Sequence, residues 1–295
     1  MRSLSLLLAL ILIFLLLSGC QTAESAQIVA TTLPAYEFTL RLCEGTGISV
    51  TPLLTGGVSC LHDYSLQVSQ MRIVSGAETV ICSGGGLEDS FHDVLDQAAI
   101  IIDSSEAISL LCPDSHEHAQ GHDHGHDHGS DSDPHYWLDP RNASIMADTI
   151  CQNLCNIYPQ QQEIFVKNLA SLQNELDVLY QYGITTLSQL NCRDMITFHD
   201  GFSYFAEAFD LRILAAVEEE AGSETSAQKL KTLITVVEEH QLPAIFVEAN
   251  GSTASASVIA AETGIKVFTL DMAITGESYF TAMYQNIQTI KEALG

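Results

Sequence analysis

The sequence predicts an α/β protein of two similar lobes, each with a four-stranded parallel sheet flanked by helices, joined by a long rigid helix. Short apolar runs alternate with helical stretches throughout, they fall into two sets of four, and the longest helical stretch separates the sets. Most of these runs are continuously apolar, which is typical of strands that helices cover on both faces. Each set therefore predicts one lobe.

The strands are expected in the following order. The first set spans Ile28–Thr32, Ile48–Leu54, Thr79–Ser83 and Ala99–Asp103. The second set spans Met195–Phe198, Ile213–Val217, Ile245–Val247 and Val267–Leu270.

Helical spacing of apolar residues predicts one helix from Asp139-Pro140 to Tyr158. A second begins with Pro159, whose missing N–H is tolerated in a first turn, and ends before Gly183. A helix this long would be a stiff spine that limits the lobes to a small rocking motion. The expected division is a lobe at 28–158 with a His-rich loop at 113–134, a connecting helix at 159–184 and a lobe at 185–295.

The N-terminus is expected to direct export. The apolar run Leu6–Leu17 follows Arg2 and is too short for a membrane span, which needs about 20 residues. Leu17-Ser18-Gly19-Cys20 resembles a bacterial lipobox, which implies removal of residues 1–19, acylation of Cys20 and a tether at 20–27 on the outer face of the cytoplasmic membrane. An ordinary signal peptide or an uncleaved anchor is the alternative.

The charge balance excludes several partners. Against 37 Asp and Glu stand 11 Lys and Arg, a net charge of −26, although 46% of the residues are hydrophobic. Such a chain repels nucleic acid and anionic lipid but can bury a core. We expect a monomer that the membrane holds only through the lipid on Cys20. Of the 8 cysteines, those after Cys20 form no CxxC pair. We expect mostly buried free thiols, with any disulfide connectivity open.

The segment from His116 to Asp133 is of low complexity, with no apolar residue larger than alanine. It is expected to be a mobile surface loop that chelates transition metals loosely, the alternative being an inert linker. Its imidazoles are His116, His118, His122, His124, His126 and His128.

Four side chains fall at or beyond the ends of expected strands: His62, His135, His199 and Asp271. Ligands of parallel sheets bind outside the carboxyl ends of the strands, so these residues should converge in the cleft between the lobes. Three imidazoles and one carboxylate complete a tetrahedral shell for Zn²⁺. His92 and His240 lie in or at the end of helical runs, which indicates structural or solvent-exposed roles.

Five segments carry a resemblance to a known family: IVATTLPAYEFTLRL, LHDYSLQVSQM, HYWLDPRNA, MITFHDGFSYFAEAF and IFVEANGSTASASVIAAETGIKVFTLD. The chain resembles, over nearly its whole mature length, the substrate-binding proteins of the zinc/manganese class of ATP-binding-cassette importers. The resemblance implies the same four metal ligands. A His-rich insertion just before HxWLDP is typical of zinc-specific members.

Two departures from the family pattern leave the ligand set open. Ser59-Cys60-Leu61 replaces the usual surroundings of the first ligand, so the Cys60 thiolate could assist His62, although a buried, unreactive thiol is the simpler interpretation. Asp271 precedes Met272-Ala273 where the family has Pro-Leu, so a water or Glu248 could take its place.

The resulting prediction is a lipoprotein, not an enzyme, that captures Zn²⁺ outside the membrane and delivers it to a cognate ATP-binding-cassette permease. Mn²⁺ is the alternative cargo, although imidazole donors favour zinc. A zinc hydrolase is the rival from another class, but HExxH is absent and a carboxylate ligand would close the fourth position. An adhesin-like surface protein is a third possibility.

Overall fold

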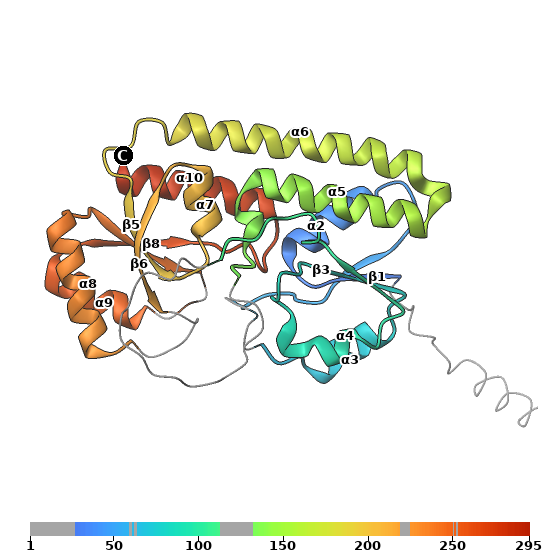
Figure 1. Cartoon of the computed structure of the whole chain (residues 1–295), viewed down its shortest axis with the longest axis horizontal. Helices are drawn as coiled ribbons and strands as arrows, with labels where there is room; N and C mark the ends of the chain where they lie inside the picture. Colours follow the sequence, from blue (N-terminus) through green and yellow to red (C-terminus); the bar gives the residue numbers. More distant parts are fainter. Residues whose placement is uncertain are drawn as a thin grey trace, which may run out of the picture.

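The structure is a computed structural model that describes residues 27–58, 61, 64–112, 132–218, 225–249, 251 and 253–295. It contains two four-stranded parallel sheets, with strand orders β2-β1-β3-β4 and β6-β5-β7-β8 (Figure 1). The first sheet comprises β1 (Ile28–Ala30), β2 (Val50–Pro52), β3 (Thr79–Cys82) and β4 (Ile100–Asp103). The second comprises β5 (Asp194–His199), β6 (Arg212–Glu218), β7 (Ala244–Glu248) and β8 (Lys266–Leu270). The predicted fold class of two similar lobes is confirmed, because the second sheet repeats the strand order of the first.

The helices of the first lobe are α2 (Leu33–Leu42), α3 (Val68–Ser75), α4 (His92–Leu95) and α5 (Pro140–Ile157). Helix α6 (Gln162–Thr186) leads to the second lobe, which contains α7 (Ser203–Ala208), α8 (Ala227–His240), α9 (Ala254–Thr263) and α10 (Tyr279–Leu294). Single 3-10 turns are η1 (Asp89–Phe91), η2 (Tyr136–Leu138) and η3 (Pro159–Gln161).

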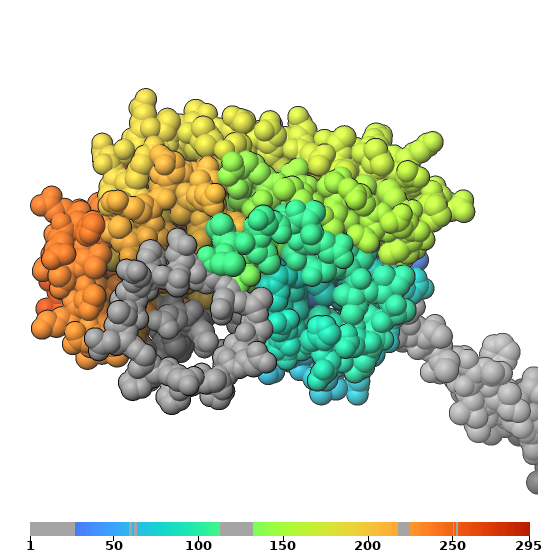
Figure 2. Space-filling model, viewed as in Figure 1, coloured from blue at the N-terminus to red at the C-terminus, as the bar shows by residue number. Residues whose placement is uncertain are grey.

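One helical layer covers both sheets. Helix α6 contacts α2, α5 and α10, helix α2 also contacts α5 and α10, and α6 runs along both lobes (Figures 1 and 2). The other faces are covered by α3 and α4 in the first lobe and by α8 and α9 in the second (Figure 1). Among the helices of the described ranges, none combines the length and the apolar character needed to cross a membrane.

Capping side chains set where the main helices begin. Thr32 accepts a hydrogen bond from the N–H of Ala35 at the start of α2, and Asp139 accepts one from Arg141 at the start of α5. Ser278 caps α10 in the same way. These bonds satisfy N–H groups that a first helical turn leaves unpaired, so the segments before the helices have defined directions.

Helix α6 continues through Gly183 instead of ending before it. Gly183 is not a helix stop because it lies against the ring of Phe209, and a Cβ at this position would stand 2.2 Å from Cε1 of that ring. The glycine therefore allows close packing between α6 and the second lobe.

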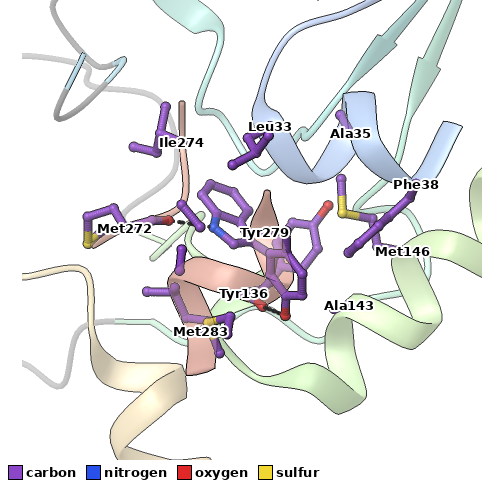
Figure 3. Packing of buried hydrophobic residues seen from close by; sticks show 14 of the residues in the cluster. Leu33, Ala35, Phe38, Tyr136, Ala143, Met146, Met272, Ile274, Tyr279 and Met283 are labelled. Atoms are coloured by element: carbon purple, nitrogen blue, oxygen red, sulfur yellow. Dashed lines mark hydrogen bonds between the residues drawn. The ribbon is translucent and has the colours of Figure 1, made fainter. Parts of the chain in front are cut away.

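A single hydrophobic cluster extends through both lobes. The rings of Phe38 on α2 and Tyr279 on α10 meet edge to face with centroids 5.0 Å apart, and the Trp137 indole N–H donates to the carbonyl of Met272 at 2.9 Å (Figure 3). A smaller cluster lies in the second lobe and includes Ile196 of β5 and Leu233 of α8. Because the lobes share a core, relative motion between them is restricted.

Candidate metal centre

Two of the predicted site residues, His135 and His199, lie together between the lobes. His199 is the last residue of β5, and His135 immediately precedes η2. Both are buried, at 1% and 4% exposure. Their ring centroids are 5.3 Å apart and the ring planes are perpendicular. Each lobe thus contributes one imidazole to the same small region.

Asp133 fixes the orientation of His135. Its Oδ1 accepts hydrogen bonds from the backbone N–H of His135 at 2.9 Å and from ring Nδ1 at 2.8 Å. An imidazole whose Nδ1–H donates to a carboxylate presents Nε2 as the basic nitrogen, and such a carboxylate also raises ligand basicity. The arrangement suits His135 to bind a transition metal.

Gly201 lies against both histidines. A Cβ at this position would stand 2.9 Å from Cδ2 of His199, 3.0 Å from Nδ1 of His135 and 2.4 Å from Cε of Met272. Sequence reasoning missed this residue, and its only signal was its place two residues after His199. Gly201 therefore leaves the space in which the two imidazoles approach each other.

Asp271 directly follows β8, as expected, and is half-buried. Asn286 of α10 brackets its peptide by accepting from the N–H of Asp271 at 2.8 Å and donating to its carbonyl at 2.7 Å. The Asp271 carboxylate accepts a hydrogen bond from the N–H of Ala273 at 2.8 Å. Burial raises the pKa of Asp271, and the Ala273 N–H opposes that rise. Asp271 also lines a groove of about 490 Å³ between β8 and α10.

Within the described ranges, no three His, Cys, Asp or Glu side chains lie close enough together to hold a metal ion. The structure thus groups His135 with His199 but does not group Asp271 with them. His62, Cys60, Cys20 and the six histidines of the 116–128 segment lie outside the described residues. Glu248 is buried at the end of β7, paired in register with Leu270 next to Asp271.

The remaining histidines and cysteines lie elsewhere. His92 and His240 are at helix ends with exposed side chains, near Asp96 and Asp194 respectively. The described cysteines carry free thiols: Cys43, Cys82, Cys112, Cys151, Cys155 and Cys192.

A buried acid that sequence reasoning missed lies at the carboxyl ends of β1 and β3. Glu88 accepts hydrogen bonds from the Thr31 hydroxyl at 2.6 Å and from the N–H groups of Ser83 and Gly84 at 2.9 and 3.0 Å. Burial raises the pKa of Glu88 to about 7, against these three donors, which lower it. Glu88 thus ties the two strand ends together.

A two-lobed α/β fold with a pair of buried imidazoles at the junction of the lobes is the architecture expected of a metal-binding protein. The family model described as ZnuA, zinc-uptake complex component A, periplasmic, matches residues 28–293. The chain therefore belongs to this family, whose members are binding components and not enzymes. The hydrolase alternative is thereby set aside.

Relatives and solved structures agree with this assignment. The zinc-binding lipoprotein AdcA of Streptococcus pneumoniae is 29% identical over 99% of this chain and 61% of its own length. A crystal structure of ZnuA is 30% identical, covers 91% of this chain and 99% of its own, and superimposes with a TM-score of 0.78. The Zn(II)-bound ZnuA-like domain of S. pneumoniae AdcA is 26% identical over 90% of this chain and 98% of its own, with a TM-score of 0.73. The chain thus spans about three fifths of the pneumococcal AdcA lipoprotein.

Proposed function

We propose that this protein captures Zn²⁺ outside the cytoplasm and delivers it to the permease of an ATP-binding-cassette importer. The observation that carries the proposal is the buried pair of imidazoles from opposite lobes, one of which is oriented by a buried carboxylate. Neutral imidazole is a preferred zinc ligand, and a carboxylate behind it is the usual second contact in zinc sites. Zinc-binding relatives and the family description support the same cargo.

The proposed ligands are His135, His199, His62 and Asp271, with the cargo ion between the lobes. Glu248 is the alternative acid. It is the last residue of β7 and pairs in register with Leu270 of β8, the residue before Asp271. Donors from both lobes would let zinc hold the lobes together, and protons compete with metal for imidazole, so affinity should fall toward pH 6.

The test is metal content after mild chelation, measured by elemental analysis of the mature chain and of variants. We expect one tightly bound zinc per chain in the wild type and its loss in His135→Ala and His199→Ala. His92→Ala is the matched control, because this exposed histidine lies outside the pair and should leave the zinc in place. A wild type without stoichiometric zinc, or a His135→Ala variant that keeps it, would overturn the proposal. Displacement by Mn²⁺ at equal concentration would instead favour manganese as cargo.

The lipid anchor and the His-rich segment belong to the same proposal. Acylation of Cys20 would hold the monomeric protein at the membrane surface, and Cys20→Ser should move it to the soluble fraction. The 116–128 segment would gather Zn²⁺ weakly and pass it inward. Deleting this segment should slow zinc acquisition and leave the tight site intact.

A further inference from the structure

Tyr204 connects the second lobe to the backbone of Asp133, the residue whose side chain orients His135. Tyr204 lies on α7, five positions after His199, and is 3% exposed. Its hydroxyl donates to the carbonyl of Asp133 at 2.9 Å and accepts from the N–H of Leu111 at 2.7 Å. Burial raises the pKa of Tyr204 to about 12, so the hydroxyl keeps its proton at neutral pH.

Leu111 and Asp133 are also paired with each other. The N–H of Asp133 donates to the carbonyl of Leu111 at 2.8 Å. These two residues flank the segment that carries the six closely spaced histidines. The Tyr204 hydroxyl therefore binds one residue on each side of this segment in the sequence.

Asp133 bonds to two residues that matter for the site, Tyr204 through its backbone and His135 through its side chain. Its backbone carbonyl is held by Tyr204, and its Oδ1 holds the Nδ1 and the backbone N–H of His135. An unbroken series of hydrogen bonds thus runs from α7 through Asp133 to His135. Since α7 follows directly after His199, the series connects elements that position both imidazoles.

We propose that Tyr204 is a positioning residue that holds Asp133, and through it His135, in the metal-binding orientation independently of the His-rich segment. This inference rests on the proposed function. It assigns to Tyr204 the orientation of His135 through Asp133, a role distinct from packing between the lobes and from binding the metal directly. Without the hydroxyl, the carbonyl of Asp133 would lose its bond to the second lobe, and only the bond from its N–H to Leu111 would still hold this backbone segment.

The test combines Tyr204→Phe with deletion of residues 113–131. The deletion joins Cys112 to Ser132, so that Leu111-Cys112-Ser132-Asp133 becomes a four-residue β-turn with its closing hydrogen bond already in place. The measurements are the zinc Kd, by competition with a chromophoric chelator, and the visible absorption of the Co²⁺-loaded protein, which reports ligand geometry.

In the wild type, we expect the deletion to leave the Kd and the Co²⁺ spectrum unchanged. Tyr204→Phe should raise the Kd about 10-fold or more, as loss of an outer contact to a metal-binding histidine does, and alter the spectrum. Adding the deletion to Tyr204→Phe should recover most of the affinity and the spectrum, because the short turn then restrains Asp133. Asp133→Asn should weaken binding, and the deletion should not recover it.

Tyr279→Phe is the matched control, because it also loses a buried interlobe hydroxyl bond, to the Trp137 carbonyl at 2.7 Å. It should lose comparable stability in urea while keeping the wild-type Kd. An unchanged Kd and spectrum in Tyr204→Phe, no recovery on deletion, or an equal loss in Tyr279→Phe would each overturn the inference. These outcomes leave the proposed function standing if the wild type binds zinc and His135→Ala does not; failure of that comparison would overturn both.

Discussion

The spacing between His135 and His199 depends on the absence of a side chain at Gly201. Three atoms of neighbouring side chains lie within 3.0 Å of where its Cβ would stand, two of them on the imidazole rings. Cβ atoms in folded proteins essentially never approach other atoms closer than this. Any side chain here must therefore displace at least one ring.

We predict that Gly201→Ala weakens zinc binding about 10-fold or more, because the imidazoles move out of the geometry that one ion can bridge. The measurement is the zinc Kd by chelator competition. Gly76→Ala is the control, since its Cβ would meet nothing closer than 3.4 Å. Equal affinities in the two variants would contradict the prediction.

Glu88 makes a second prediction at the scale of one residue. Burial raises the pKa of Glu88 to about 7 in the folded chain, above the value of 4.5 for an exposed glutamate. Between these values Glu88 binds more protons in the folded state than in the unfolded state, so its contribution to stability is fully present below pH 4.5 and is lost as the pH rises to 7. At about 1.4 kcal/mol per pKa unit, the contribution amounts to roughly 3 kcal/mol.

Glu88→Gln should therefore show a smaller fall in unfolding free energy between pH 5 and pH 7.5 than the wild type. Urea titrations of the metal-free protein at the two pH values measure the difference. Glu163→Gln, at an exposed position on α6, should keep the wild-type slope. Parallel slopes in wild type and Glu88→Gln would show that Glu88 titrates normally.

At the scale of elements, α6 holds the two lobes together through close packing. Gly183 allows the Phe209 ring to lie against the helix backbone. The sequence predicted that the helix ends before this glycine, but the glycine lies within the helix. The packing against Phe209 offsets the helix propensity of glycine, which is about 1 kcal/mol less favourable than that of alanine.

We predict that Gly183→Ala destabilises the protein by about 1 to 3 kcal/mol, although alanine is the better helix former, because the added methyl group overlaps the ring. Ser171→Ala, at an exposed position of the same helix, should be neutral or slightly stabilising. The measurement is the unfolding free energy of each variant from urea titration. A Gly183→Ala variant more stable than the wild type would contradict the prediction that the Phe209 ring fills this space.

At the scale of the molecule, the shared core implies that the lobes unfold together. Trp137 is the sole tryptophan, is fully buried and bonds to Met272 of the other lobe. Its fluorescence therefore reports the junction, whereas far-ultraviolet circular dichroism reports the helices of both lobes.

We predict that the two signals give one superimposed transition in urea, as a two-state protein requires. Phe38→Leu removes the edge-to-face ring contact with Tyr279 and should lower the unfolding free energy by about 1 to 3 kcal/mol. The urea midpoints of both signals should therefore fall together. Two separated transitions would show that the lobes fold independently and that the junction is a weak contact.

Local patterns in the chain were sufficient to predict both sheets and the residues beyond the strand ends. Continuous apolar runs identify buried parallel strands, and the residues that follow them face the same edge of a sheet. His199 and Asp271 lie at such ends, as predicted. These features could be read from the sequence because each depends on a few consecutive residues.

The tertiary structure alone decided which side chains support the imidazoles and which tie the strand ends of the first lobe together. Tyr204 and Asp133 are 71 residues apart, and Thr31 and Glu88 are 57 apart, so no periodicity relates them. Gly183 is read as a helix stop until the Phe209 ring lies beside it, and the role of Gly201 becomes visible only when the two imidazole rings lie beside it. Strand order and residue chemistry are local properties, whereas hydrogen bonding and close packing between lobes arise only when distant segments meet.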